Sequence, residues 1–220
     1  MILMSRLFEK KQPDRDASLF IIYCEGSRRE PKYFQYFEGI STRVRLEIIN
    51  TDSQGNNSPA GLFEQARVDI EGDSHENPSK YELGSEDQVW FVIDTDMWDT
   101  HIVTLRKECM QRVNWNIAQS NPCFEVWLYY HFFSDDAHNI VLDGCGPWKM
   151  YVNEHVSGGF DSRKHPYLIA DAIRHAELHF REQGEHGVAY GSTEVFKLGK
   201  ALFPLVAVAL EKARKRVDES

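Results

Sequence analysis

The chain has 220 residues, enough to bury a sizeable core in one domain, and 42% of them are hydrophobic and 12% aromatic. This composition argues against a disordered chain and predicts a folded globular protein. The formal net charge of -9 argues against a broad electrostatic grip on nucleic acid or on an anionic membrane. It does not exclude a phosphate substrate, because divalent cations or a basic partner can supply the missing positive charge.

The sequence carries no sign of export or of membrane insertion. The apolar start of the chain is too short for a signal peptide. The longest apolar stretch, residues 201–210, is about half the roughly 20 residues that a membrane span needs, and it contains Pro204. Scattered cysteines without a CxxC pair predict reduced thiols in a soluble, cytoplasmic protein. These cysteines are Cys24, Cys109, Cys123 and Cys145.

Residues 18–133 alternate between strand and helix patterns. Near-continuous apolar runs predict buried strands, and apolar residues at helical spacing predict helices between them. The predicted strands are 18–26, 45–50, 87–94 and a weaker 114–120, and the predicted helices are one that begins at Pro31, 60–70, 99–113 and one that Asn121 and Pro122 open. The alternation predicts an α/β fold, a mostly parallel sheet flanked by helices and joined by right-handed crossovers.

The rest of the chain, residues 134–220, is predicted to be a helical extension packed on this α/β core in a single compact unit. Helical patterns cover residues 165–183 and 191–217. Pro204 is expected to kink or split the last helix, because proline lacks an N–H and clashes with the preceding turn. Asp99 or Thr100 is the predicted cap of the helix that follows the third strand.

Acidic residues stand where two of the predicted strands end. Glu25 follows the first strand, and Asp94 and Asp96 end the third, VWFVIDTD. In parallel sheets, ligands bind beyond the carboxyl ends of the strands, so these carboxylates converge if the two strands are neighbours. The i, i+2 spacing of the aspartates directs both to one side. Repulsion within such a cluster requires shifted protonation, basic side chains or a metal ion, and oxygen ligands favour Mg2+ or Mn2+.

Each acid also has an ordinary structural interpretation. A single acid at a strand end is explained equally well as a loop residue or a helix cap. The three acids together favour a metal site. His175 and His179 lie four residues apart on a predicted helix, but the chain has no HExxH motif and the pattern predicts an exposed face, so zinc is not favoured.

Three strings carry a family resemblance: CEGSRREPKYF, VIDTD and SNPCFEVWLYYH. The EG after one buried strand and the DxD after another resemble the two halves of a TOPRIM signature. The strings in this order resemble the RloB-like family of prokaryotic, defence-associated TOPRIM proteins, and the late GSTEVFKL resembles the C-terminal segment of that family. The resemblance extends from about residue 18 to about residue 200 and implies a TOPRIM/Rossmann-like sheet.

The resemblance implies a metal-dependent phosphoryl-transfer centre of the kind found in topoisomerases, primases and related nucleases. Glu25 would be the acid-base or metal-bridging residue, and Asp94 and Asp96 would hold the cation. Glu30 resembles the second acid after EG, and Asn121 and Glu125 match the SNPxFE string. The resemblance implies that Glu30 and Glu125 would be further metal ligands and that Asn121 would contact the substrate. These last three also fit a helix start, where Glu30 and Glu125 would be favourable acids and Asn121 a cap.

Phosphoryl transfer also needs basic groups that meet the developing negative charge. Arg28 and Arg29 follow Glu25 closely and are candidates for phosphate contacts, although such a pair is more often a solvated turn. Lys197 and Lys200 could reach in from the C-terminal helix.

The leading hypothesis is therefore a Mg2+- or Mn2+-dependent nuclease that cuts DNA or RNA, tRNA included, as an effector of antiphage defence. The resemblance implies an ABC-type ATPase partner, and the chain itself has no GxxxxGK[ST] loop for ATP. One alternative is a non-catalytic TOPRIM-like subunit that binds metal or a partner. Another is a housekeeping enzyme of RNA maturation or primer synthesis. A two-fold homodimer is the default assembly.

Overall fold

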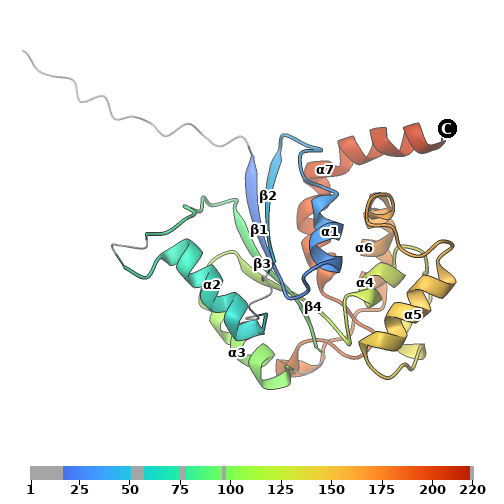
Figure 1. The fold of residues 1–220 in the computed structure, drawn as a ribbon, viewed down its shortest axis with the longest axis horizontal. Coiled ribbons are helices and arrows are strands. Elements are labelled where there is room, and N and C mark those ends of the chain that lie inside the picture. Colours follow the sequence, from blue (N-terminus) through green and yellow to red (C-terminus); the bar gives the residue numbers. More distant parts are fainter. Residues whose placement is uncertain (1–16, 51–56, 75–77, 96–97, 219–220) are drawn as a thin grey trace, which may run out of the picture.

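The computed structural model describes residues 17–50, 57–74, 78–95 and 98–218 (Figure 1). Its centre is a four-stranded sheet in the order β2-β1-β3-β4, and every neighbouring pair is parallel. The α/β prediction is confirmed, and each predicted strand is present. The strands are β1 (Ser18–Cys24), β2 (Val44–Asn50), β3 (Gln88–Asp94) and β4 (Trp115–Ser120).

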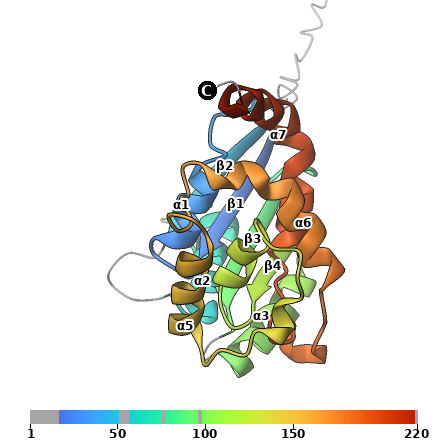
Figure 2. The same cartoon turned by 90° about the vertical axis from the view of Figure 1, so that its right-hand side faces the viewer.

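Helices cover both faces of the sheet. On one face lie α2 (Pro59–Glu71) and α3 (Asp99–Met110), and on the other lie α1 (Arg29–Gln35), α4 (Glu125–Tyr129) and α7 (Val195–Asp218) (Figure 1). Figure 2 shows the C-terminal helices on this second side. They are α5 (Cys145–His155) and α6 (Ile169–Leu178), with short 3-10 turns η1 (Ala137–Asn139), η2 (His165–Leu168) and η3 (Gly184–His186) between them.

Two hydrophobic cores explain why the central strands are apolar at nearly every position. In β1, Phe20 and Ile22 face the core under α1, α4 and α7, whereas Ile21 and Tyr23 face the core under α2 and α3. Successive strand residues point to opposite faces, so a strand covered on both sides needs an unbroken apolar run. The larger core also contains side chains of α5, α6 and α7, such as Leu202.

The strand order creates a switch point between β1 and β3. The chain moves from β1 to β2 on one side and then places β3 on the other side of β1. The loops that follow β1 and β3 therefore leave the sheet in a crevice at its carboxyl edge, the usual ligand position in such folds. Within the described residues, no helix is both long and apolar enough to cross a membrane.

Several predicted helix ends are wrong. The cap of α3 is Trp98, without a side-chain hydrogen bond, and not Asp99 or Thr100. The helix predicted over 165–183 divides into η2 and α6 and ends at Leu178. The predicted exposure of the histidine pair also fails, because His175 is buried and its Nδ1 lies 2.9 Å from the carbonyl oxygen of Tyr130.

Pro204 does not split the last helix. It lies inside α7, which runs on to Asp218, and Figure 1 shows that α7 bends towards its C-terminal end. The side chain of Arg43 donates to the carbonyl oxygen of Pro204 at 3.1 Å, and Ser41 Oγ donates to that of Leu205 at 2.7 Å. These donors join α7 to the turn before β2 where proline disturbs the helix.

Phe91→Ala tests the core beneath α2 and α3. Phe91 is fully buried in β3, and its ring lies 5.6 Å from that of Tyr23 and 5.7 Å from that of Trp115. Because truncation leaves a cavity, we expect the free energy of unfolding in urea to fall by about 3–5 kcal/mol. Met110→Ala, at a side chain that is 86% exposed, should change it by no more than about 0.5 kcal/mol. Equal losses in the two variants would contradict this core.

Candidate active site at the carboxyl ends of β1 and β3

Glu25 joins the ends of two neighbouring strands. Its backbone N–H continues the sheet by donating to the carbonyl oxygen of Val92 at 3.0 Å. Its carboxylate accepts the backbone N–H of Asp94 at 2.9 Å and the indole N–H of Trp98 at 2.7 Å. The expectation that Glu25 and Asp94 meet on adjacent strands is therefore confirmed. Trp98, which sequence reasoning did not single out, orients the first acid.

Asp94 connects this pair to the start of α4. Its Oδ1 accepts the backbone N–H of Phe124 at 2.9 Å. Immediately after it, the backbone N–H of Thr95 donates to the carbonyl oxygens of Ser120 and Pro122 at 2.9 and 3.2 Å. These bonds hold the segment after β4 against the end of β3, and they bring the first turn of α4 to the same edge of the sheet. Asp96 lies outside the described residues.

Glu30 folds back over the glycine of the EG motif. Its side chain is buried in α1, and a Cβ added at Gly26 would lie 1.9 Å from Glu30 Oε2. Any side chain at position 26 would therefore displace this carboxylate. A glycine is required at position 26 because the Glu30 carboxylate lies where a Cβ would be. The turn that contains Gly26 thus has one acid before it, Glu25, and another after it, Glu30.

Glu125 contributes a fourth acid whose bonding is incomplete. It is the first residue of α4, is only 2% exposed, and its Oε1 is buried without a hydrogen-bond partner. The nearest cation is Arg29, whose Nε lies 3.7 Å away, too far for a hydrogen bond. Leaving a buried acceptor unpaired costs about 1–3 kcal/mol, and more for a charged group. Such an oxygen is suited to a cation that binds between the acids.

The acids raise one another's pKa. Burial, followed by the charges of Glu30 and Glu25, raises the pKa of Asp94 well above its usual range. Burial also raises the pKa of Glu30; a backbone hydrogen bond opposes this shift and the charge of Glu125 adds to it. Burial and mutual repulsion therefore favour a bound proton or a bound cation at these carboxyl groups.

Lys149 is a basic residue of this site that the sequence gave no reason to select. It projects from α5, and although burial lowers its pKa, the charges of Glu125, Cys123 and other groups outweigh that effect and raise it. Its ammonium group is therefore near enough to Glu125 and Asp94 for their charges to act on it. The packing of α5 against α4 brings Lys149 near these acids. No local sequence motif predicts such a contact.

Arg29 is brought to the acids, as its ion pair with Glu125 shows. Together with Arg28 it lines a groove of about 1070 Å³ beside α1.

Asn121 is occupied elsewhere. Its side chain donates to the carbonyl oxygen of Val188 at 2.9 Å, and its backbone N–H to that of Ser192 at 2.9 Å. It is not the cap of α4, which begins at Glu125 after Phe124 without a side-chain cap. The helix-cap interpretation is therefore wrong, and the amide that was expected to contact substrate instead fixes the loop before α7.

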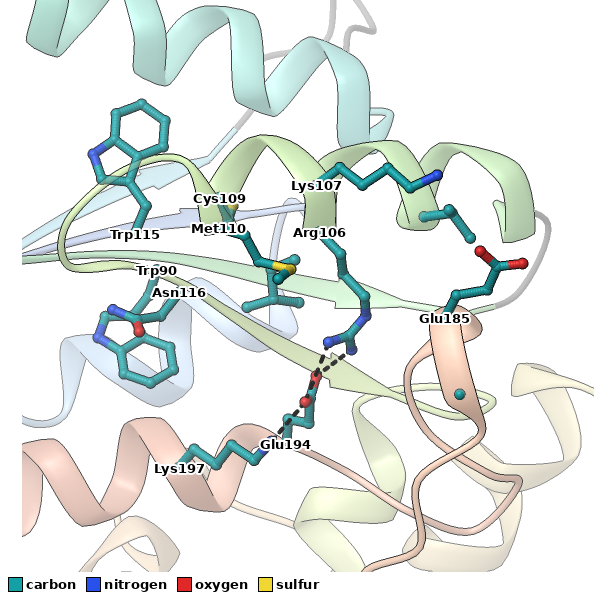
Figure 3. A pocket seen from close by; sticks show the side chains of 13 residues that line it. Trp90, Arg106, Lys107, Cys109, Met110, Trp115, Asn116, Glu185, Glu194 and Lys197 are labelled. Atoms are coloured by element: carbon teal, nitrogen blue, oxygen red, sulfur yellow. Dashed lines mark hydrogen bonds and ion pairs between the residues drawn. The ribbon is translucent and has the colours of Figure 1, made fainter.

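Lys197 and Lys200 also have other partners. Lys197 and Arg106 both bind Glu194, in a pocket of about 460 Å³ beside β4 (Figure 3). Lys200 pairs with Glu177 at 2.6 Å. Among the described residues, no hydrogen bond or ion pair joins either lysine to the acids at β1 and β3. The sequence predicted that phosphoryl transfer needs basic groups, but it could not predict that Lys197 and Lys200 pair with Glu194 and Glu177.

A divalent cation fits the chemistry of the donors, although the ligand set is not assembled. The donors are carboxylate oxygens, which suit Mg2+ and Mn2+, and the unpartnered oxygen of Glu125 favours an added cation. Within the described part of the chain, however, no three His, Cys, Asp or Glu side chains are grouped to hold one ion.

Comparison with protein-family models matches residues 20–202 to the RloB-like protein family. This confirms the resemblance inferred from the three sequence strings. Searches of curated proteins and of solved structures returned no significant match.

Asp94→Asn should stabilise the metal-free protein at neutral pH. Asparagine keeps the oxygen that accepts from Phe124 but removes the charge. Because the folded state raises the pKa of Asp94 above its ordinary 3.8, the stability that its proton supplies is present at low pH and is lost as the pH rises through the raised value. In EDTA at neutral pH, we therefore expect Asp94→Asn to melt at a higher temperature than the parent protein, by about 2–4 °C for each kcal/mol of added stability. This difference should shrink as the pH falls towards 3.8.

Asp143→Asn, which removes an exposed carboxylate, is the matched control and should leave the melting temperature unchanged. A variant at Asp94 that is less stable than the parent at neutral pH in EDTA would contradict the electrostatic account of the site.

Proposed function

Because the chain belongs to the RloB-like family, we propose that it is a Mg2+- or Mn2+-dependent nuclease that hydrolyses phosphodiester bonds of DNA or RNA, tRNA included. The observation that carries the proposal is the gathering of acids at the switch point of the sheet. Glu25 and Asp94 meet there across β1 and β3, and the charges of Glu30 and Glu125 help to raise the pKa of Asp94. Ordinary loop or helix-start roles leave the buried, unpartnered Oε1 of Glu125 unexplained.

The residues have distinct roles in this proposal. A divalent cation held by Asp94, Asp96, Glu30 and Glu125 would supply charge neutralisation and activation of water. Glu25, fixed by two N–H donors, accepts a proton from the attacking water. As the new P–O bond forms, the bond to the leaving oxygen breaks, and that oxygen takes a proton from solvent.

Two cations at the rim serve the charge that develops during the reaction. Arg29 lies beside Glu125, and the charges of Glu125 and Asp94 raise the pKa of Lys149. Both can face a phosphate placed over the carboxylates, where fixed positive charge stabilises the transition state more than the ground state.

A role as effector of antiphage defence, with an ABC-type ATPase as partner, is proposed on the family resemblance. The absence of a GxxxxGK[ST] loop from the sequence fits this division of labour, because ATP hydrolysis would have to come from another protein. A housekeeping role would instead predict slow growth when the gene is deleted in uninfected cells.

A non-catalytic, metal- or partner-binding subunit is the second candidate. It is favoured by one observation: the described side chains do not assemble three ligands around one ion. The two candidates separate on whether the purified protein cuts nucleic acid and on whether the aspartates are needed for its biological effect.

Cleavage tests the leading proposal. The protein is incubated with plasmid, single-stranded DNA and total RNA including tRNA, each with Mn2+, Mg2+ or EDTA. We expect cleavage that needs the cation and that falls more than about 100-fold in Asp94→Asn/Asp96→Asn, because even residues that only support metal ligands contribute up to that factor. Asp73→Asn/Asp143→Asn removes two exposed carboxylates and should cut as the parent does. Cleavage that survives EDTA or the Asp94/Asp96 changes would refute the proposed mechanism.

Lys149→Gln separates transition-state stabilisation from binding. Loss of one group that meets developing charge lowers kcat by about 10²–10³-fold in related cases, so we expect a fall of about 10²-fold with KM little changed. Lys107→Gln, at an exposed lysine of α3, is the control. A rise in KM alone, or an equal effect of both changes, would remove Lys149 from the catalytic role.

A further inference from the structure

A basic groove adjoins the acids on the outer side of α1. It measures about 1070 Å³, and two parts of the chain form it: α1 and the segment 158–163. Its charged lining residues are four cations and one acid, in a chain whose net charge is -9. They are Arg28, Arg29, Lys32, Arg163 and Asp161.

The positive charge of this groove is poorly neutralised. Among the described residues, no carboxylate lies within ion-pair distance of Arg28 or Lys32, which are four positions apart at the start of α1. Arg163 pairs with Asp161, but its side chain is 88% exposed. Such exposed pairs are weak, so an incoming anion can compete for the arginine.

The other pocket rich in cations behaves differently. Beside β4, Arg106 and Lys197 both bind the buried Glu194, so their charge is balanced within the protein (Figure 3). An anion would have to displace a buried carboxylate there. The groove beside α1 is therefore the better candidate for a polyanion.

Arg29 links the groove to the acids. It lines the groove, and its Nε lies 3.7 Å from Glu125 Oε1. The opposite wall is anchored by Phe160, whose buried ring packs at 5.2 Å from the ring of His131 and at 6.2 Å from that of Tyr33. Both walls thus pack on the core that also carries α1 and α4, and Arg29 places the groove next to Glu125.

We propose that this groove binds the phosphates of a nucleic-acid strand and leads the strand to the acids at β1 and β3, with Lys32 and Arg163 as phosphate contacts away from the cleavage centre. The inference rests on the proposed nuclease function for its substrate class. It adds that the C-terminal part of the chain supplies one wall of the substrate path. Neither residue touches the reacting atoms, so both are positioning residues.

Binding measured without cleavage tests the groove. The parent for this test is Asp94→Asn/Asp96→Asn in EDTA, and the probes are fluorescein-labelled single-stranded DNA and RNA of the same length, followed by anisotropy over a range of salt. Each phosphate contact to a single strand contributes about 0.7 to the slope of log affinity against log salt. Lys32→Gln/Arg163→Gln on this parent should therefore lower the slope by about 1.4. If the parent and this variant bind equally at about 1 M salt, the variant should bind about 25-fold more weakly than the parent at about 0.1 M salt.

The matched control on the same parent is Lys107→Gln/Arg214→Gln, which removes one exposed lysine and one exposed arginine from α3 and α7. It should keep the parental slope. Three results would refute the proposal that the groove binds nucleic acid. They are equal effects of the two pairs of substitutions, an unchanged slope in Lys32→Gln/Arg163→Gln, and a parent that binds neither probe. The difference between the DNA and RNA arms would indicate which strand the groove accepts. Because no cleavage is required, a failed nuclease assay and a failed groove remain distinguishable.

Discussion

The hydrogen bond from the backbone N–H of Asp94 to the carboxylate of Glu25 is the contact on which the site depends. Two acids at the ends of neighbouring strands would otherwise repel and turn apart. Backbone and indole N–H groups hold them instead: Glu25 by Asp94 and Trp98, and Asp94 by Phe124. Because these donors are fixed by the sheet and by α4, the two acids stay together although the pKa of Asp94 is raised. Their negative charge is left for a ligand to neutralise.

A buried polar contact in the core keeps Glu30 and Glu125 in place. The hydroxyl of Tyr33 in α1 and the ring of His131, just after α4, lie 3.0 Å apart, and His131 Nδ1 lies 3.0 Å from the carbonyl oxygen of Trp127. Burial lowers the pKa of His131 to about 3, so the ring is neutral at physiological pH. Its Nδ1–H donates to the carbonyl, and its Nε2 accepts from the tyrosine. The helices that carry the two acids are thereby fixed to each other.

The sequence predicts this site as far as strand periodicity and turn chemistry reach. Apolar runs that end in acids located Glu25 and Asp94, because residues at the ends of adjacent parallel strands must lie together. Lys149 and Arg163 could not be found that way, since each reaches the site or the groove through packing of the C-terminal part. The contacts of Asn121 and Lys197 were unpredictable for the same reason. Their residue types suit phosphate, but the fold directs them to Val188 and Glu194.

The distribution of charge couples the steps of the proposed reaction. The acids oppose one another while no cation is bound, so a cation that relieves this repulsion stabilises the folded site. The cations of α1 and α5 limit how much positive charge the acids alone can attract, because they already balance part of it. A phosphate in the groove would bind Arg29 and weaken its ion pair with Glu125. The affinity of Glu125 for the metal ion would then increase. Linkage requires the effect to be reciprocal, so bound metal would also tighten the grip on the strand. In a protein with a net charge of -9, the cations of the groove would bind the strand, and a metal ion at the acids would add to that affinity.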